Sequence, residues 1–285
     1  MRFLAMIGAG SLDPSAPIVR ADDNGLTRGD GCFEGCRVLT MADGTSRVDK
    51  PAAHLVRMAR SAAALELPFD IDEWDAFVTS AVTAWHDPGE WAMKLVLTRG
   101  AGAGAPPTGF LTISDLPTNY ARQRRDGLRV ATLSRGTSAD AFADAPWLLG
   151  GVKTLSYAVN MAAQREAARR GCDDAILVSV DGAVLESTVS SVVWSVGRRL
   201  HTTPIGATGI LGGTTQQLLF DQASRAGWDC VSVPATVADL HAAEVLWLIG
   251  SVRGPVDVVE LDGTARVRRP DLDAQIRSLA GFGPR

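Results

Sequence analysis

Hydrophobic residues recur at strand-like and helix-like spacings in turn, in two separate blocks of the chain. Arg2–Ile7 and Cys36–Met41 have the pattern of strands, and Pro51 opens a stretch with helical spacing. The stretch Pro117–Asp126 is polar and contains three arginines, and similar strand and helix patterns resume beyond it. These patterns predict a mixed α/β protein with an N-terminal α/β domain at residues 1–117, an interdomain joint at 118–126 and a C-terminal α/β domain at 127–285.

Composition limits the classes of partner. With 285 residues, of which 46% are hydrophobic, the chain can bury a core in each of two domains. The net charge is −4 and no basic tract stands out, so we expect neither nucleic acid nor a membrane as a partner. The longest apolar run, Val245–Ile249, is too short to span a bilayer, and the N-terminus has the pattern of a first strand. We therefore expect a cytoplasmic protein.

The sequence motifs give little support for a metal site or for hydrolase activity. The four cysteines form no CxxC pair, and the four histidines form no HExxH motif or other pair at ligand spacing. No GxSxG motif is present. We predict no metal site.

Lys153 is the first candidate for chemistry. It follows Gly150-Gly151 at the start of a predicted helix, Thr154–Arg169. The positive end of a helix dipole disfavours a cation and favours the free amine that Schiff-base chemistry requires. The alternative interpretation is a solvated lysine in a first helical turn.

Glu186 is a second candidate. It ends a predicted hairpin, DDAILVSVDGAVLE, that turns on Asp181-Gly182. One helix and one hairpin separate it from Lys153, so the chain can return beside the lysine. A carboxylate there can keep a pyridine nitrogen protonated, whereas the alternative is a hairpin-end glutamate in solvent.

A phosphate site is indicated further along the chain. Gly212-Gly213 precedes Thr214 and Thr215 at the start of a predicted amphipathic helix, where backbone N–H groups and hydroxyls can bind an anion. Arg57 could add a guanidinium that donates two hydrogen bonds to the phosphate, and Ser251 could add another hydroxyl. The alternatives are a capped glycine turn, a surface arginine and a turn-capping serine.

Seven segments occur together in the order found in one enzyme family. They are RGDGCFEGCRV at 28–38, HLVRM at 54–58, LVLTRG at 95–100, VKTLSYAVN at 152–160, DDAILVSVDGAVLESTVSSV at 173–192, GILGGTTQ at 209–216 and LWLIGS at 246–251. On these segments the chain resembles the fold-type IV pyridoxal 5′-phosphate (PLP) enzymes: branched-chain aminotransferases, D-amino acid aminotransferases and aminodeoxychorismate lyases. The resemblance implies the two-domain, D-amino acid aminotransferase-like fold, with PLP in the interdomain cleft, and a homodimer.

The resemblance also implies roles for individual residues. Lys153 matches the lysine that holds PLP as a Schiff base, and Glu186 matches the partner of the pyridine nitrogen. Tyr157 falls near a ring-side tyrosine or asparagine. The residues that match the phosphate cup are Arg57, Thr214, Thr215 and Ser251.

Some positions depart from the family pattern without removing a catalytic group. Asn24 stands where an arginine is usual, and Ser191 and Ser251 stand where asparagine and threonine are usual. GILGGTTQ lacks the proline and the closing arginine of GILPGITR.

Two reactions remain open within the family. GDGCF is similar to the lyases, whereas Glu34-Gly35 is similar to the aminotransferases. D-amino acid enzymes tend to have a histidine two residues after the arginine that matches Arg99, and Ala101 stands there. We favour 4-amino-4-deoxychorismate lyase, which yields 4-aminobenzoate and pyruvate in folate synthesis. The alternatives are a D-amino acid or branched-chain aminotransferase and, from another class, a non-catalytic relative that binds a phosphorylated ligand.

Overall fold

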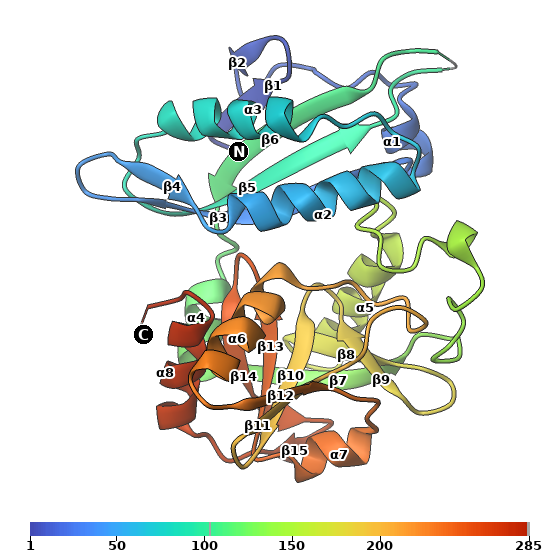
Figure 1. Cartoon of the computed structure of the whole chain (residues 1–285), viewed down its shortest axis with the longest axis vertical. Helices are drawn as coiled ribbons and strands as arrows, with labels where there is room; N and C mark the ends of the chain where they lie inside the picture. The colour runs from blue at the N-terminus through green and yellow to red at the C-terminus, as the bar shows by residue number, and fades with distance from the viewer. Residues whose placement is uncertain (103, 284–285) are drawn as a thin grey trace. The chain divides into compact units, whose positions relative to one another are not determined.

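The computed structural model describes residues 1–102 and 104–283, so Ala103, in the glycine-rich loop at 100–107, lies outside the described residues. The chain forms two compact units (Figure 1). Unit 1 comprises Met1–Pro117 and the short segment Val152–Tyr157, and unit 2 comprises Thr118–Gly151 and the residues from Ala158 onward. Both units combine helices with a sheet, which confirms the prediction of a mixed α/β fold.

Unit 1 contains an antiparallel sheet with the strand order β2-β1-β6-β5-β3-β4. Its elements are β1 (Phe3–Met6), β2 (Gly10–Leu12), α1 (Asn24–Arg28), β3 (Gly31–Thr40), β4 (Ser46–Val48), α2 (Pro51–Ala64), α3 (Ile71–Thr83), β5 (Gly89–Thr98) and β6 (Thr108–Asp115). Helices α2 and α3 pack against each other and on strands of this sheet. Leu55, Met58 and Ala62 recur at helical spacing on α2 and are buried, so this face of α2 forms part of the core.

Unit 2 contains a mixed sheet with the strand order β12-β11-β10-β13-β14-β7-β8-β9, and β15 pairs with β14. Its first elements are α4 (Tyr120–Asp126), β7 (Leu128–Ser134), the 3-10 helix η1 (Pro146–Leu148), α5 (Ala158–Arg169), β8 (Asp174–Val178), β9 (Val184–Ser187), β10 (Ser191–Val196) and β11 (Arg199–Thr202). The remainder are α6 (Thr214–Arg225), β12 (Asp229–Ser232), α7 (Val237–Ala242), β13 (Val245–Gly250), β14 (Gly254–Leu261), β15 (Thr264–Ala265) and α8 (Pro270–Leu279).

The apolar run of β13 is explained by burial on both faces. Leu246 and Leu248 pack in the cluster that includes Leu240 of α7. Trp247 packs with Val245 and Ile249 in the cluster formed with α6 and α8. Because helices cover both faces of this strand, it has a continuous apolar sequence rather than an alternating one.

Within the described residues, no helix has the length and apolar character needed to cross a membrane.

Candidate functional site

Lys153 lies in an extended segment of unit 1. The Phe33 N–H donates to the Lys153 carbonyl (3.1 Å), and the Leu155 N–H donates to the Gly31 carbonyl (2.8 Å). Strand β5 occupies the other edge of β3 along this stretch, and β4 pairs with β3 only from Val38 onward. The lysine segment therefore pairs with the part of the β3 edge that β4 leaves uncovered.

This pairing corrects the predicted start of the helix. The sequence placed it at Thr154, but α5 begins at Ala158. The backbone of the lysine segment bonds across to β3, so it cannot form the i to i−4 bonds of a helix. A helix dipole therefore does not act directly on Lys153, contrary to the prediction, because its effect falls off within the first turn.

Two aromatic side chains, Phe33 and Tyr157, contact the Lys153 amine instead. Nζ donates a hydrogen bond to Tyr157 Oη (2.9 Å). It also lies 4.2 Å from the centroid of the Phe33 ring and 4.9 Å from that of Tyr157. The two rings meet edge to face, with centroids 4.9 Å apart. This cage fixes the position of the amine.

Helix α2 contributes to the same region. The Ser61 hydroxyl, which is buried, accepts a hydrogen bond from the Lys153 N–H (3.2 Å). Ser61 lies one turn after Arg57 on α2. Sequence reasoning did not identify Phe33 or Ser61 as site residues, although Phe33 closes the GDGCF motif.

Arg57 is buried in unit 1 and bound by Glu34 of β3. Its Nε and Nη2 donate to the two carboxylate oxygens of Glu34, each over 2.7 Å. His54 Nδ1 lies 2.8 Å from the same carboxylate. Burial alone would raise the pKa of Glu34, but the hydrogen bonds from Arg57 and His54 and the charge of Arg57 outweigh it and lower the pKa to about 2. Burial lowers the pKa of His54, so this histidine is neutral at pH 7.

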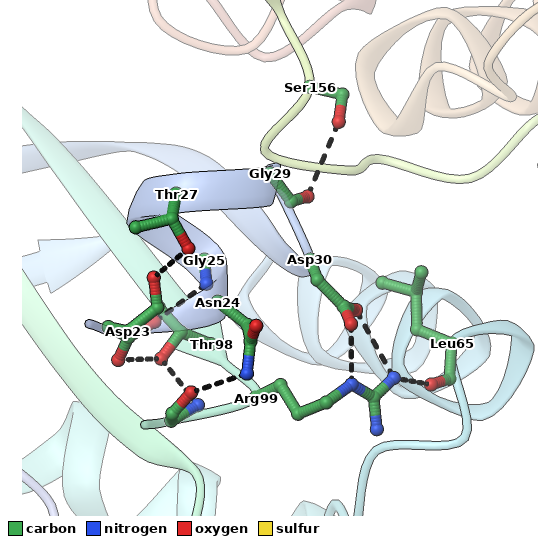
Figure 2. Close-up of polar contacts among 11 residues, drawn as sticks. Asp23, Asn24, Gly25, Thr27, Gly29, Asp30, Leu65, Thr98, Arg99 and Ser156 are labelled. Carbon is green, nitrogen blue, oxygen red and sulfur yellow. Dashed lines mark hydrogen bonds and ion pairs between the residues drawn. The ribbon is translucent and has the colours of Figure 1, made fainter. Parts of the chain in front are cut away.

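A second group of polar contacts supports α1 (Figure 2). Asp23, at the N-cap, accepts hydrogen bonds from the Gly25 N–H and the Thr98 hydroxyl, each over 2.7 Å. At the other end Gly29 adopts a left-handed conformation (φ 72°), and its carbonyl accepts from the Ser156 hydroxyl (3.4 Å). A Cβ at Gly29 would overlap the Ser156 side chain, so glycine allows the lysine segment to lie close to α1.

Arg99, which follows β5, is held within unit 1 (Figure 2). Its Nε and Nη2 donate to the two oxygens of Asp30, over 2.5 and 3.1 Å. Nη2 also donates to the Leu65 carbonyl (2.5 Å). The guanidinium therefore already has a bidentate carboxylate partner from its own unit.

In unit 2 the structure brings together three hydroxyls from the predicted phosphate site. Ser251, directly after β13, lies 3.1 Å from Thr214 Oγ1 and 3.0 Å from Thr215 Oγ1. Thr214 and Thr215 are the first residues of α6, and Gly213 is its N-cap. The hydroxyls therefore converge where the helix presents its first N–H groups.

Glu186 is tied to the loop that leads into this cluster. It lies on β9, and its carboxylate accepts a hydrogen bond from the Leu211 N–H (3.1 Å). Leu211 precedes Gly212, Gly213 and the hydroxyls of α6 in the chain. Burial lowers the pKa of Arg135, and the charge of Glu186 opposes that shift, so the carboxylate acts on a nearby cation.

The residues present fit PLP. The hydroxyls at the N-terminus of α6 suit a phosphate, since hydroxyl and N–H donors can both face its oxygens. The Lys153 amine suits an aldehyde, and the Glu186 carboxylate suits a protonated pyridine nitrogen.

Comparison with known proteins agrees with this chemistry. The family described as amino-transferase class IV matches residues 31–261. A protein of Mycobacterium tuberculosis named bifunctional aminodeoxychorismate lyase / D-amino acid transaminase is 40% identical over 268 residues, which cover 91% of each chain.

Solved structures give the same result. The PLP-bound form of a hypothetical aminotransferase from Mycobacterium tuberculosis has a TM-score of 0.91 and 38% identity, covering 98% of this chain and 97% of the other. The fold IV-transaminase CpuTA1 from Curtobacterium pusillum has a TM-score of 0.90 and 37% identity, over the same shares of both chains. The cofactor of this enzyme is PLP. The chain belongs to the class IV aminotransferases and has their fold, that of the fold-type IV PLP enzymes.

Proposed function

We propose that this enzyme is a 4-amino-4-deoxychorismate lyase that forms 4-aminobenzoate and pyruvate, and that it transaminates D-amino acids more slowly with the same residues. The M. tuberculosis relative bears both activities in its name and is 40% identical, which supports this pair of reactions.

The lack of a second donor beside Arg99, where Ala101 replaces a histidine, carries the preference for the lyase. An α-amino acid needs a cationic partner for its carboxylate, and by resemblance Arg99 occupies the position of that partner in D-amino acid enzymes. Its guanidinium is engaged by Asp30 and by the Leu65 carbonyl. Ala101 supplies no second donor in place of histidine. The reacting amine of aminodeoxychorismate is not part of an α-amino acid, so its binding does not require this contact.

Each residue of the proposed site has a separate role in the reaction. PLP, when bound, supplies an aldehyde for the substrate amine and a conjugated ring that accepts electrons. In our proposal Lys153 Nζ holds the cofactor at rest, and once released it takes the proton from the substrate carbon that bears the amine. Tyr157 Oη orients Lys153 Nζ through their hydrogen bond. Glu186 keeps the pyridine nitrogen protonated. The phosphate is bound by Arg57, Thr214, Thr215 and Ser251.

The two reactions separate after the proton has been removed. In the lyase reaction the bond from the neighbouring ring carbon to the enolpyruvyl oxygen breaks, the ring becomes aromatic, and the enolpyruvate released takes up a proton to become pyruvate. In transamination Lys153 would hold the same proton and return it on the cofactor side, so that the amino group would stay with the cofactor and water would release the keto acid. Substrate fit therefore decides between them.

Steady-state kinetics tests the proposal. We expect kcat/KM for aminodeoxychorismate to exceed that for D-alanine, L-glutamate and L-leucine, each assayed with pyruvate or 2-oxoglutarate as acceptor. If any amino acid is preferred by about tenfold or more, aminotransferase is the main function. A protein without cofactor absorbance or either activity would be a non-catalytic relative.

We also propose that the lyase acts in folate synthesis and that the enzyme is a cytoplasmic homodimer. Analytical ultracentrifugation of the PLP-loaded protein tests the dimer, and cell fractionation tests the location.

A further inference from the structure

Glu34 is a buried carboxylate to which the proposed mechanism gives no role. It lies on β3 with none of its surface exposed, and it accepts hydrogen bonds from side chains of α2. Placing a charge there is costly unless it is paired and fully hydrogen-bonded. A role for this charge is therefore to be sought in the residues that it binds, Arg57 and His54.

The contacts fix the plane of the Arg57 guanidinium. Nε and Nη2 form two parallel hydrogen bonds to the two oxygens of one carboxylate, each over 2.7 Å. This geometry allows one orientation of the fork, whereas a single contact would permit rotation. His54 Nδ1 binds the same carboxylate, which holds Glu34 against rotation in turn.

The charges of the three side chains make the orientation of the Arg57 guanidinium more important for phosphate binding than its net charge. Glu34 is negative, Arg57 positive and His54 neutral, so the cluster carries no net charge. Arg57 therefore offers a phosphate directed N–H groups more than an excess of positive charge. Removing the charge of Glu34 would leave the guanidinium with more net charge but a less defined direction.

We propose that Glu34 is a positioning residue that orients Arg57 toward the PLP phosphate, with His54 holding Glu34 in place. The inference rests on the proposed role of Arg57 in phosphate binding. It predicts that Glu34 affects phosphate recognition specifically, not the binding of the pyridine ring.

The test compares two ligands that differ in the phosphate. Apoenzyme is titrated by absorbance with PLP and with pyridoxal, which has a hydroxyl in place of the phosphate. We expect Glu34→Gln to raise the Kd for PLP about tenfold and to change the Kd for pyridoxal less than twofold. In an Arg57→Ala background the same substitution should have no further effect on the ratio of the two Kd values, because Glu34 acts through Arg57.

A matched control is available on the same strand. Arg37 of β3 forms a buried pair with Asp49, with Nε and Oδ2 2.6 Å apart and both side chains less than a tenth exposed. Asp49→Asn also breaks a buried arginine–carboxylate pair, so it reproduces the general cost to stability. We expect it to leave the ratio of the PLP and pyridoxal Kd values unchanged.

The outcomes separate the two proposals. If Arg57→Ala leaves the Kd ratio unchanged, Arg57 does not bind the phosphate and the proposed function loses that contact. If Arg57→Ala changes the ratio but Glu34→Gln does not, or if Glu34→Gln binds PLP more tightly, only the positioning role is overturned. Should Glu34→Gln fail to fold, Glu34→Asp keeps the charge but withdraws the carboxylate by one methylene. The same rise in the ratio is expected for it, and no rise overturns the role.

Discussion

Replacement of Tyr157 by phenylalanine isolates one hydrogen bond of the lysine cage. Tyr157→Phe removes the oxygen that lies 2.9 Å from Lys153 Nζ but keeps the ring that contacts Phe33. A hydrogen bond to a charged group contributes about 1.5–3 kcal/mol. Because both side chains are only partly buried, we expect about 1–2 kcal/mol here. If Tyr157 orients Nζ for proton transfer, this loss corresponds to a fall in kcat of roughly 5- to 30-fold.

The assay is single-turnover formation of 4-aminobenzoate by PLP-saturated enzyme. Tyr120→Phe is the matched control, since Tyr120 is the other tyrosine of the chain and lies on α4. We expect the control to react within twofold of wild type and Tyr157→Phe to retain its bound cofactor. If Tyr157→Phe also reacts within twofold of wild type, the Tyr157 hydroxyl does not orient the lysine for proton transfer.

Three further predictions concern the lysine and two carboxylates. Borohydride reduction of the holoenzyme followed by peptide mapping should place the cofactor label on Lys153, and a label on Lys50 or Lys94 would contradict the assignment. Glu186→Gln should retain PLP but lose about a hundredfold or more in turnover, because an amide stabilises a protonated pyridine less well than a carboxylate; near-normal turnover would show that Glu186 is not the ring partner. The lowered pKa of Glu34, from 4.5 to about 2, means that its contribution to stability is present above pH 4.5 and is lost as the pH falls toward 2. This shift corresponds to at most about 3 kcal/mol, so urea unfolding at pH 5, 4 and 3 should show a steeper acid loss for wild type than for Glu34→Gln, and equal slopes would argue against a buried charged Glu34.

Local patterns identified the three hydroxyls that meet at the start of α6 as candidates, and the family resemblance joined them in one predicted phosphate site. Thr214 and Thr215 follow two glycines at a helix start, and Ser251 follows a strand whose apolar run shows that it is central. Each signal depends on neighbours within a few residues, and sequence periodicity records such signals well. Each hydroxyl could therefore be singled out from its own segment, whereas their grouping came from the resemblance.

Contacts between distant parts of the chain were harder to predict from the sequence. The segment around Lys153 has residues compatible with a helix, but its hydrogen bonds to the uncovered edge of β3 keep it extended. The spacing of hydrophobic residues in the segment gives no information about that edge, because the edge belongs to a distant strand. The same holds for Arg57, which the sequence identified as a charged fork, although the carboxylate that binds it lies on another element. β14 (Gly254–Leu261), which pairs with both β13 and β7, was also missed because its partners are set by sheet topology.

The place of Lys153 in unit 1 has a consequence for the order of folding. Ser61 and β3 leave the ribosome early, but the lysine that they bind follows Ser61 by 92 residues. In between, the chain has already entered unit 2 at Thr118, and it returns to unit 2 at Ala158. Closing a loop of this length carries an entropic cost that a local contact does not, so pairing of the lysine segment with β3 is expected to be a late step. A nascent chain that has reached only Pro117 contains Arg57 and Glu34 but not Lys153. If Lys153 holds PLP as we propose, its covalent attachment to the cofactor reports that this long-range pairing has formed.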